Sequence, residues 1–506
     1  MSEPRSPGGA GPLWLLVTLQ GAISGASLVV EIVAGRMIAP YVGMSLYTWT
    51  AIIAVVLAGF SVGHWWGGRM AGAGTGPALR RAGWTMVGAA VTTGAAALLL
   101  RAIAGPVLET LADPLAAITA LTMLVFFLPS LFAGVPAPIL AVVAMEGKTA
   151  PERALGAMFA AGAVGAIGGT LLAGFLFISL LGSAATLAII TALYAVSAVT
   201  CFWLAGRAPH LAAIGGVALA MAMGAGALAL PPICDRESRY YCIRTVDLSG
   251  DPSDPVRLMV LDHLAHGISA EAAPRVMFTP HTAMLDALPR MRFPQGFSSF
   301  HIGGGSYSVP RAWADRGIGP ITVAEIDPAV TATAEAAFWF DPKTARILHR
   351  DARRALAQET ERYDVIVGDA FTDIAVPAHL VTEEFFRLVA DRLTEGGLYV
   401  MNVVDSTDRL DALSALVVTL RQAFSTVEVW TEARPPEPGE RRVFVLVAGA
   451  AASPVSQIET RAPDPMRFAV LDPAFVDDVI ARRGPPVLTD DFAPIDRLVG
   501  LEPISD

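Results

Sequence analysis

The chain has 506 residues, 54% of them hydrophobic and 16% charged, with a formal net charge of −10 at pH 7; a single hydrophobic core does not hold a chain of this length. Residues 1–230 carry nine Lys/Arg and six Asp/Glu, which leaves 27 and 40 for residues 231–506, so the two parts have net charges of about +3 and −13. These values predict a membrane domain followed by an acidic soluble region, and they argue against nucleic-acid binding because an acidic surface repels phosphates.

Seven apolar stretches in the first part are long enough to cross a bilayer core, which takes about 20 residues. Gly and Ala dominate them, as in closely packed membrane helices. The short stretch 134–145 contains two prolines and either extends the fourth span with a kink or dips back into the membrane. The first stretch lacks a basic leader and runs into further spans, so we do not expect a cleaved signal peptide. The expected spans lie near residues 13–35, 47–68, 83–104, 115–134, 154–181, 184–205 and 210–230.

Three ionisable residues lie inside or at the edge of these spans: Glu31, Arg36 and His64. Ionisable groups in a membrane are costly to bury and are usually paired. The favoured interpretation is a Glu–Arg or Glu–His pair that fixes helix packing. The alternative is a site for a proton or a polyamine-like cation.

Residues 231–295 have the features of a small β domain. The stretches YYCIRTVDL and VRLMVL are β-rich and are separated by the turn-forming SGDPSDP, which predicts a hairpin. His263, His266 and His281 follow this hairpin. Their spacing does not resemble that of metal ligands, so we interpret them as the edge of a polar pocket and expect no metal.

The most informative stretch of the chain is FHIGGGSYSVPRAWADRGIGPITVAEID. One apolar run ends in Gly303, Gly304 and Gly305, and the next ends in Glu325 and Asp327. This order of strand, glycine turn, helix, strand and acid is typical of nucleotide sites in α/β domains, where the acid accepts hydrogen bonds from ribose hydroxyls. The Gly-x-Gly-x-x-Gly spacing is absent, so an adenosyl ligand such as S-adenosylmethionine is favoured over a nicotinamide dinucleotide.

Strands and helices alternate from residue 297 onward, which predicts a Rossmann-like domain over residues 296–506 with a mostly parallel sheet and helices on both faces. Ligands bind such sheets beyond the carboxyl ends of the strands. The expected strands lie near residues 297–302, 321–326, 346–349, 363–369, 397–404 and 441–448.

Further acids follow two of these strands. Asp351 and Ala352 follow the third strand, where the carboxylate either accepts the adenine amino group or caps a helix. Asp369 ends the fourth strand, and Asp373 lies in the loop beyond it. A carboxylate at such a place can hold or deprotonate an amine nucleophile. For Asp373 a solvated loop acid is the alternative.

Six motifs, taken in order, resemble the spermidine synthase (polyamine aminopropyltransferase) family: GGGSYSVPR, VAEIDPAV, RDARRAL, YDVIVGDAF, PAHLVTEEFF and LTDDFAPID. The whole chain is similar to the membrane-fused bacterial members of this family. Their first span carries a Glu and an Arg ahead of a Pro–Gly loop, as Glu31, Arg36, Pro40 and Gly43 do here.

The resemblance implies a bacterial inner-membrane protein with a multi-pass helical domain at 1–230, a small β domain at 231–295 and a methyltransferase-type fold at 296–506. It also implies roles for three acids: Glu325 would bind ribose, Asp351 would bind adenine, and Asp369 would orient and deprotonate the attacking amine. The product would be methylthioadenosine, and no cofactor is expected besides S-adenosylmethionine or its decarboxylated form as substrate.

The chain departs from the family pattern near the substrate tail. Ser306 stands where the glycine motif normally continues with Asp, which removes a charge that would repel the carboxylate of intact S-adenosylmethionine by about 1–4 kcal/mol at a separation of about 4 Å. His266 stands in place of the usual Gln. Asp369 and Asp373 are one residue further apart than the two acids of the family's loop.

These departures leave three activities open. The favoured one is a polyamine aminopropyltransferase. The first alternative is a lyase that cleaves intact S-adenosylmethionine to a lactone and methylthioadenosine, with a methyltransferase less favoured. The second is a transporter or sensor that binds the nucleoside without turnover, which retention of all three acids argues against. The expected partners are a small-molecule substrate and the lipid bilayer; a homo-oligomer is left open.

Two features of the protein predict opposite sides of the membrane for the soluble region: the distribution of Arg and Lys, and the expected substrate. Most Arg and Lys of the spans gather in loops on one side, and the positive-inside rule then places the soluble region outside. S-adenosylmethionine is made and kept in the cytosol, and on this ground we expect a cytoplasmic catalytic domain. Cys234 and Cys242 follow the last span; if they form a disulfide the domain is extracytoplasmic, and if they are reduced the cytosolic placement stands.

Overall fold

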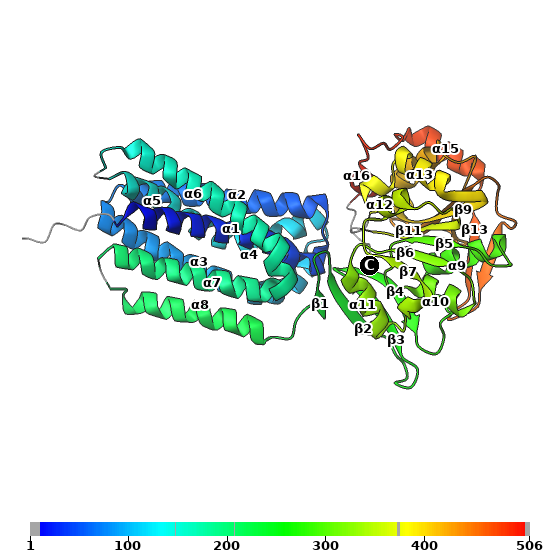
Figure 1. Cartoon of the computed structure of the whole chain (residues 1–506), viewed down its shortest axis with the longest axis horizontal. Coiled ribbons are helices and arrows are strands. Elements are labelled where there is room, and N and C mark those ends of the chain that lie inside the picture. The colour runs from blue at the N-terminus through cyan, green and yellow to red at the C-terminus, as the bar shows by residue number, and fades with distance from the viewer. Residues whose placement is uncertain (1–10, 147, 207, 372–374, 501–506) are drawn as a thin grey trace, which may run out of the picture. The chain divides into compact units, whose positions relative to one another are not determined.

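The computed structural model describes residues 11–146, 148–206, 208–371 and 375–500. It divides into two compact units, Met1–Cys242 and Ile243–Asp506. The first is a bundle of apolar helices and the second is built around a twisted sheet (Figure 1). The chain is thus a multi-pass helical domain fused to a small β domain and a Rossmann-like α/β domain.

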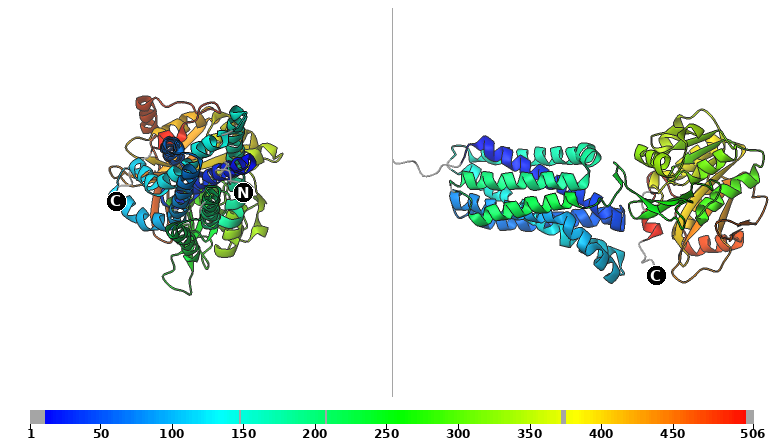
Figure 2. Two further views of the ribbon diagram at one scale, coloured as in Figure 1. Left: turned by 90° about the vertical axis from the view of Figure 1, so that its left-hand side faces the viewer. Right: turned by 90° about the horizontal axis from the view of Figure 1, so that it is seen from below.

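Spans that follow one another along the chain of the first unit run in opposite directions (Figures 1 and 2). Each is apolar over nearly its whole surface, as expected for helices surrounded by lipid. Their bounds are α1 Leu13–Val42, α2 Leu46–Ala71, α3 Thr75–Thr110, α4 Pro114–Gly134, α5 Pro136–Met145, α6 Pro151–Leu172, α7 Ile178–Leu204 and α8 Leu211–Ala229, with a π-helical turn at Ala173–Phe177 between α6 and α7.

Within the described residues, six helical segments are long and apolar enough to span a membrane. The fifth, Pro151–Leu204, has 54 residues, about 80 Å of helix, which is more than twice the thickness of a bilayer core. It is broken at Gly182, where φ is 77°, and therefore makes two crossings. The fourth segment joins α4 and α5 into one span of 32 residues, so the stretch 134–145 extends that span and does not dip back. The segments together make the seven predicted crossings.

Close helix packing explains the abundance of glycine in the spans. A Cβ atom on Gly165 of α6 would lie only 2.0 Å from the carbonyl oxygen of Gly21 on α1, and one on Gly169 only 2.2 Å from that of Gly25. Gly63 of α2 approaches the backbone of α4 in the same way. Small residues allow this contact between backbones.

The ion pair predicted for the membrane domain is not formed. Arg36 instead donates hydrogen bonds to the backbone carbonyls of Tyr240 at 2.5 Å and Ser238 at 3.1 Å. His64 is exposed on α2, where its ring lies 6.4 Å from that of Phe60. The prediction was wrong because the chain beyond α8 folds back on the end of α1 and satisfies the guanidinium. A proton or cation site at Glu31 stays a prediction.

A disulfide joins Cys234 to Cys242, with Cα atoms 5.2 Å apart. It closes a short loop directly after α8. The expected cytoplasmic placement of the catalytic domain required these cysteines to be reduced, so this bond argues against it.

A small antiparallel sheet follows the last span. The predicted hairpin is confirmed, because the second and third strands pair from Ile243–Leu261 to Asp247–Arg257. The fourth strand was not predicted and carries His266. The strand order is β1 Arg236–Glu237, β2 Cys242–Asp247, β3 Val256–Leu261 and β4 Leu264–Ala270.

The main sheet of the described chain has nine strands in the order β12-β13-β10-β11-β9-β8-β5-β6-β7. The five strands from β9 to β7 are parallel, as predicted, whereas β10 to β13 extend the sheet by antiparallel pairs. The strands are β5 Ser299–Ile302, β6 Ile321–Ala324, β7 Arg346–Leu348, β8 Tyr363–Gly368, β9 Leu393–Ser406, β10 Thr426–Glu432, β11 Arg441–Gly449, β12 Gln457–Thr460 and β13 Met466–Val470.

Helices cover both faces of this sheet (Figure 1). One face packs its largest apolar cluster, with Phe385, Phe386 and Leu416 completely buried, under α12 to α16. The other face is covered by α9 to α11, where Trp313 is buried. The helices are α9 Pro280–Arg292, α10 Ser308–Asp315, α11 Pro328–Ala337, α12 Ala352–Gln358, α13 Glu383–Arg392, α14 Asp411–Leu420, α15 Pro473–Arg483 and α16 Ile495–Val499.

Candidate active site

The predicted site residues meet where the direction of strand order reverses. Strand β5 pairs in parallel with β6 on one side and with β8 on the other, so the chain builds the sheet outward in both directions from β5. Parallel strands end at the same edge, and the crevice beyond such a reversal is the usual ligand site of open α/β sheets. The glycine turn follows β5, Glu325 follows β6, Asp351 follows β7 and Asp369 follows β8.

The glycine turn is packed too closely for side chains. A Cβ atom on Gly303, where φ is 92°, would lie 2.5 Å from the carbonyl oxygen of Asp369. A Cβ on Gly304 would lie 2.4 Å from the ring of Tyr307, and one on Gly305 would lie 3.1 Å from the carbonyl oxygen of His266. The turn therefore lies directly between the end of β8 and strand β4, with its backbone facing both.

Glu325 fixes this turn to the end of β6. Its side chain is 6% exposed and accepts two backbone hydrogen bonds, from Gly304 N at 2.9 Å and from Asp327 N at 2.9 Å. Burial raises the pKa of the Glu325 carboxyl, and the backbone N–H groups of Asp327, Gly304 and Gly305 oppose that rise. Each carboxylate oxygen keeps a further lone pair, so ribose hydroxyls can still donate to it. Asp327 caps helix α11 by accepting from Ala329 N at 2.9 Å.

Asp351 caps helix α12, the structural alternative considered for it. Its Oδ1 accepts from Arg354 N at 2.9 Å, and Ala352 begins the helix. Its Oδ2 lies 2.7 Å from Nε2 of His379, a partner that the sequence did not indicate because it comes from a distant loop. The adenine role of Asp351 and Ala352 stays a prediction.

Asp369 lies among polar side chains that come from three separate parts of the chain. Asn402 of β9 donates from Nδ2 to its Oδ1 at 2.9 Å. Burial lowers the pKa of His266 to about 4 and also lowers the pKa of His281, although the negative charge of Asp369 raises both. Both imidazoles are therefore neutral at neutral pH. Asp373 lies outside the described residues.

Asn402 is the residue of this group that the sequence analysis missed. A polar side chain in the middle of the apolar strand YVMNVV was the available signal. Its Oδ1 atom is buried and has no hydrogen-bond partner among the described residues. A buried acceptor of this kind costs free energy unless a ligand satisfies it, so it marks the place beside Asp369 as a polar subsite.

Ser306 is buried under strand β4 and is only 2% exposed. Its Oγ lies 2.5 Å from Oγ of Ser308, which in turn lies 3.0 Å from Oγ of Ser269. A Cβ on Gly267 would lie 2.1 Å from the Ser306 Oγ. This chain of hydroxyls ties the glycine turn to β4 without any charge, and a larger side chain at position 306 would have to displace β4.

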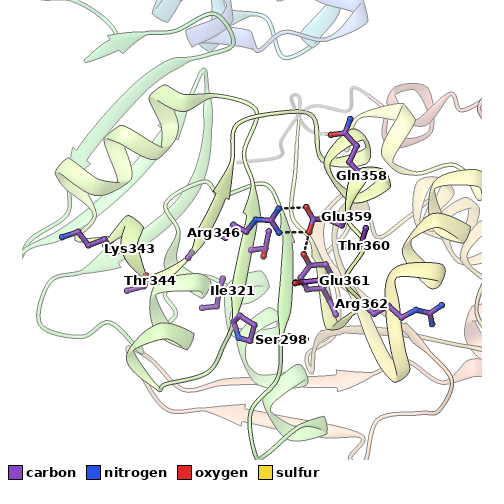
Figure 3. Close-up of a pocket in the computed structure, with 14 residues that line it drawn as sticks. Ser298, Ile321, Lys343, Thr344, Arg346, Gln358, Glu359, Thr360, Glu361 and Arg362 are labelled. Carbon is purple, nitrogen blue, oxygen red and sulfur yellow. Dashed lines mark hydrogen bonds and ion pairs between the residues drawn. The ribbon is translucent and has the colours of Figure 1, made fainter.

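A polar cavity at the opposite, amino end of the strands is not part of this site. Figure 3 shows Arg346 and Glu359 facing one another in it, with distances of 2.7 and 2.9 Å between their nitrogen and oxygen atoms. Tyr363 also donates to Glu359 at 3.0 Å. The cavity is bounded by the beginnings of four strands, at Ser298, Ile321, Arg346 and Tyr363. Arg346, Glu359 and Tyr363 thus link the beginnings of β7 and β8.

The comparisons with known proteins each cover part of the chain. A polyamine aminopropyltransferase of Vibrio vulnificus is 33% identical over 153 residues, which are 29% of this chain and 49% of the relative. A probable polyamine aminopropyl transferase of Bifidobacterium longum is 31% identical over 131 residues, which are 26% of this chain and 29% of the relative. The chain is therefore similar, over part of its length, to proteins named polyamine aminopropyltransferases. The chain spans about half the length of the first of these relatives and under a third of the second.

A solved structure is similar at a lower level of identity. The comparison gives a probable spermidine synthase from Corynebacterium glutamicum that is 20% identical, covers 49% of this chain and 94% of its own, and has a TM-score of 0.42. No family model matches the chain.

Proposed function

We propose that this chain is a membrane-bound enzyme of the spermidine synthase type in the cytoplasmic membrane of a bacterium. It breaks the γ-carbon–sulfur bond of decarboxylated S-adenosylmethionine and transfers the aminopropyl group to an amine. The observation that carries this proposal is the place of Asp369, at the strand reversal and in contact with the glycine turn. Relatives named as polyamine aminopropyltransferases support it.

In the proposed reaction the residues of this chain bind, orient and accept a proton. Glu325 holds the ribose, and the side of the site near Asp351 takes the adenine. Asp369, oriented by Asn402, accepts a proton from the attacking amine. The amine nitrogen then bonds to the γ-carbon as the carbon–sulfur bond breaks, and the electron pair stays on sulfur, giving neutral methylthioadenosine. Because His266 and His281 are neutral, they do not compete with the cationic amine for the carboxylate.

A second candidate is a lyase that acts on intact S-adenosylmethionine. The chain of three serine hydroxyls at Ser306 carries no charge that would repel the substrate's carboxylate. In that reaction the substrate's own carboxylate attacks the γ-carbon, and the products are a lactone and methylthioadenosine. The same site residues serve both reactions up to the choice of nucleophile.

Mass spectrometry of the purified full chain separates these candidates. The protein is incubated with S-adenosylmethionine or its decarboxylated form, each with and without putrescine. Methylthioadenosine that forms from the decarboxylated donor only with putrescine establishes aminopropyl transfer, and its formation from intact S-adenosylmethionine without an amine establishes the lyase. Binding of the nucleoside without any methylthioadenosine overturns both and favours a transporter or sensor.

A further inference from the structure

We propose that the α/β domain lies on the extracytoplasmic side of the membrane. This inference concerns the membrane domain and the segment that leaves it, so it does not rest on the proposed function. Three observations carry it: the number of crossings, the distribution of Arg and Lys, and the disulfide.

Contacts within the first unit show which ends of the membrane-spanning helices lie at the same face of the bundle. Arg36, near the end of α1, donates to the carbonyls of Ser238 and Tyr240. Ser183, next to the break at Gly182 within α7, donates from N and Oγ to the Glu237 carboxylate at 2.8 and 2.7 Å. The end of α1, the turn at Gly182 and the exit from α8 therefore lie at one face of the bundle. We name this the exit face; the loops after α2, α5 and α7 lie at the opposite face.

Arg and Lys gather at the opposite face. Beside the described parts of its three loops lie Arg69, Arg80, Arg81, Lys148 and Arg153, whereas the exit-face ends of the spans have Arg36 and Arg101. Arg36 is already bound to backbone carbonyls. An excess of Arg and Lys in short loops marks the cytoplasmic side of a membrane protein. The opposite face is thus cytoplasmic, and the exit face, from which the α/β domain continues, is extracytoplasmic.

The disulfide gives an independent argument for the same side. Cys234 and Cys242 lie just beyond α8 at the exit face and are bonded to one another. Structural disulfides persist in oxidising compartments and are rare in the cytosol, where thiols are kept reduced. The third cysteine, Cys201, is buried within α7 and stays free.

This placement has a consequence for the substrate. S-adenosylmethionine and its decarboxylated form are charged cytosolic compounds, and charged compounds do not cross a bilayer core unaided. An active site outside the cytosol therefore needs a transport step that delivers the donor, or a donor of this class taken up from the surroundings.

Cysteine labelling in spheroplasts tests the placement. In the full chain with Cys201→Ala, one variant adds Ser253→Cys in the turn between β2 and β3, and a matched variant adds Ala73→Cys in the turn after α2. Both positions are exposed. A membrane-impermeant maleimide is applied to intact and to detergent-permeabilised spheroplasts, and the variant without an added cysteine is the background. We expect Ser253→Cys to react in intact spheroplasts and Ala73→Cys to react only after permeabilisation. The reverse pattern overturns the proposal.

Acid-quenched cells test the redox argument separately. The parent chain for this test carries Cys201→Ala, and its Cys234 and Cys242 are alkylated in denaturant with a maleimide that carries a polymer, which changes the mobility of the chain for each free thiol. We expect no change before reduction and two additions after it. Cys234→Ser is the control, because it frees Cys242 and should give one addition without reductant. Two additions to the unreduced parent chain overturn the argument from the disulfide.

Discussion

Asp369 is held by one side-chain amide, which allows its charge to be removed with little change of shape. In Asp369→Asn the amide oxygen can still accept from Asn402, so the site keeps its geometry but loses its proton acceptor. We expect turnover to fall by about 10²–10⁴-fold while nucleoside binding is largely kept. Methylthioadenosine formation and calorimetry measure the two quantities. Near-normal turnover would remove Asp369 from the mechanism.

Glu325 both fixes the glycine turn and is predicted to bind ribose. In Glu325→Gln an NH₂ group replaces one carboxylate oxygen, so either Gly304 N or Asp327 N loses its hydrogen-bond acceptor. The ribose hydroxyls also lose a charged acceptor. We expect adenosyl binding to weaken by about 1–3 kcal/mol in calorimetry. Asp364→Asn is the control, because Asp364 also accepts from a backbone N–H, that of Ser298 at 2.8 Å, at the amino end of β8. Equal losses in both variants would show that ribose is not involved.

His266 makes the stability of the α/β domain depend on pH. Burial lowers its pKa from 6.5 to about 4 in the folded protein, so the unfolded chain binds more protons between these values. The stability that a neutral His266 retains above pH 6.5 is therefore lost as the pH falls towards 4. We expect the thermal unfolding midpoint to fall less over this range in His266→Gln, which cannot titrate. His281 and His301 have lowered pKa values as well and remain in both proteins. Identical pH profiles would contradict the assignment.

At the level of elements, the glycine turn is the most sensitive part of the site. Gly303→Ala combines a positive φ with a Cβ that would lie 2.5 Å from the backbone of Asp369. Gly317→Ala is a matched control, since its φ of 71° imposes similar strain but nothing lies within 4 Å of the added Cβ. We expect each to cost about 1–2 kcal/mol of stability from the backbone alone. Gly303→Ala should in addition abolish turnover, measured as methylthioadenosine release, whereas Gly317→Ala should keep it.

The sequence predicted the elements that carry the site better than the rest of the sheet. Strands β5, β6 and β8 are short apolar runs that end in glycine or acid, and such boundaries are visible in a sequence. The strands β10, β12 and β13 were missed, because they are partly polar and their antiparallel order depends on pairing with distant segments. For the same reason Asn402 and His379 could not be assigned to the site: each reaches it from a part of the chain far away in sequence.

At the level of the whole molecule, the composition of the sequence predicted the two units, but it did not predict the contacts of the segment that connects them. The charge difference and the seven apolar stretches were enough to predict a membrane domain. The contact of Arg36 with the chain after α8 was not predictable, because backbone carbonyls are present everywhere in a sequence and give no signal. For that reason the sequence analysis paired Arg36 with a nearby acid. Whether Cys234 and Cys242 form a disulfide was left open, because their pairing depends on the path of the loop between them.

The two units differ enough in surface to be separable. In the second unit the large hydrophobic residues that are clearly exposed are few and scattered, namely Val246, Leu248, Met291, Phe475 and Phe492, whereas the helices of the first unit expose many that face lipid. We expect a fragment of residues 243–506 to stay in solution without detergent and to unfold in one cooperative transition, followed by circular dichroism. A fragment that begins at residue 211 adds only α8 and the segment after it, and it should require detergent. If the shorter fragment aggregates as well, the α/β domain depends on the membrane domain for its fold, and its activity then has to be studied in the full chain.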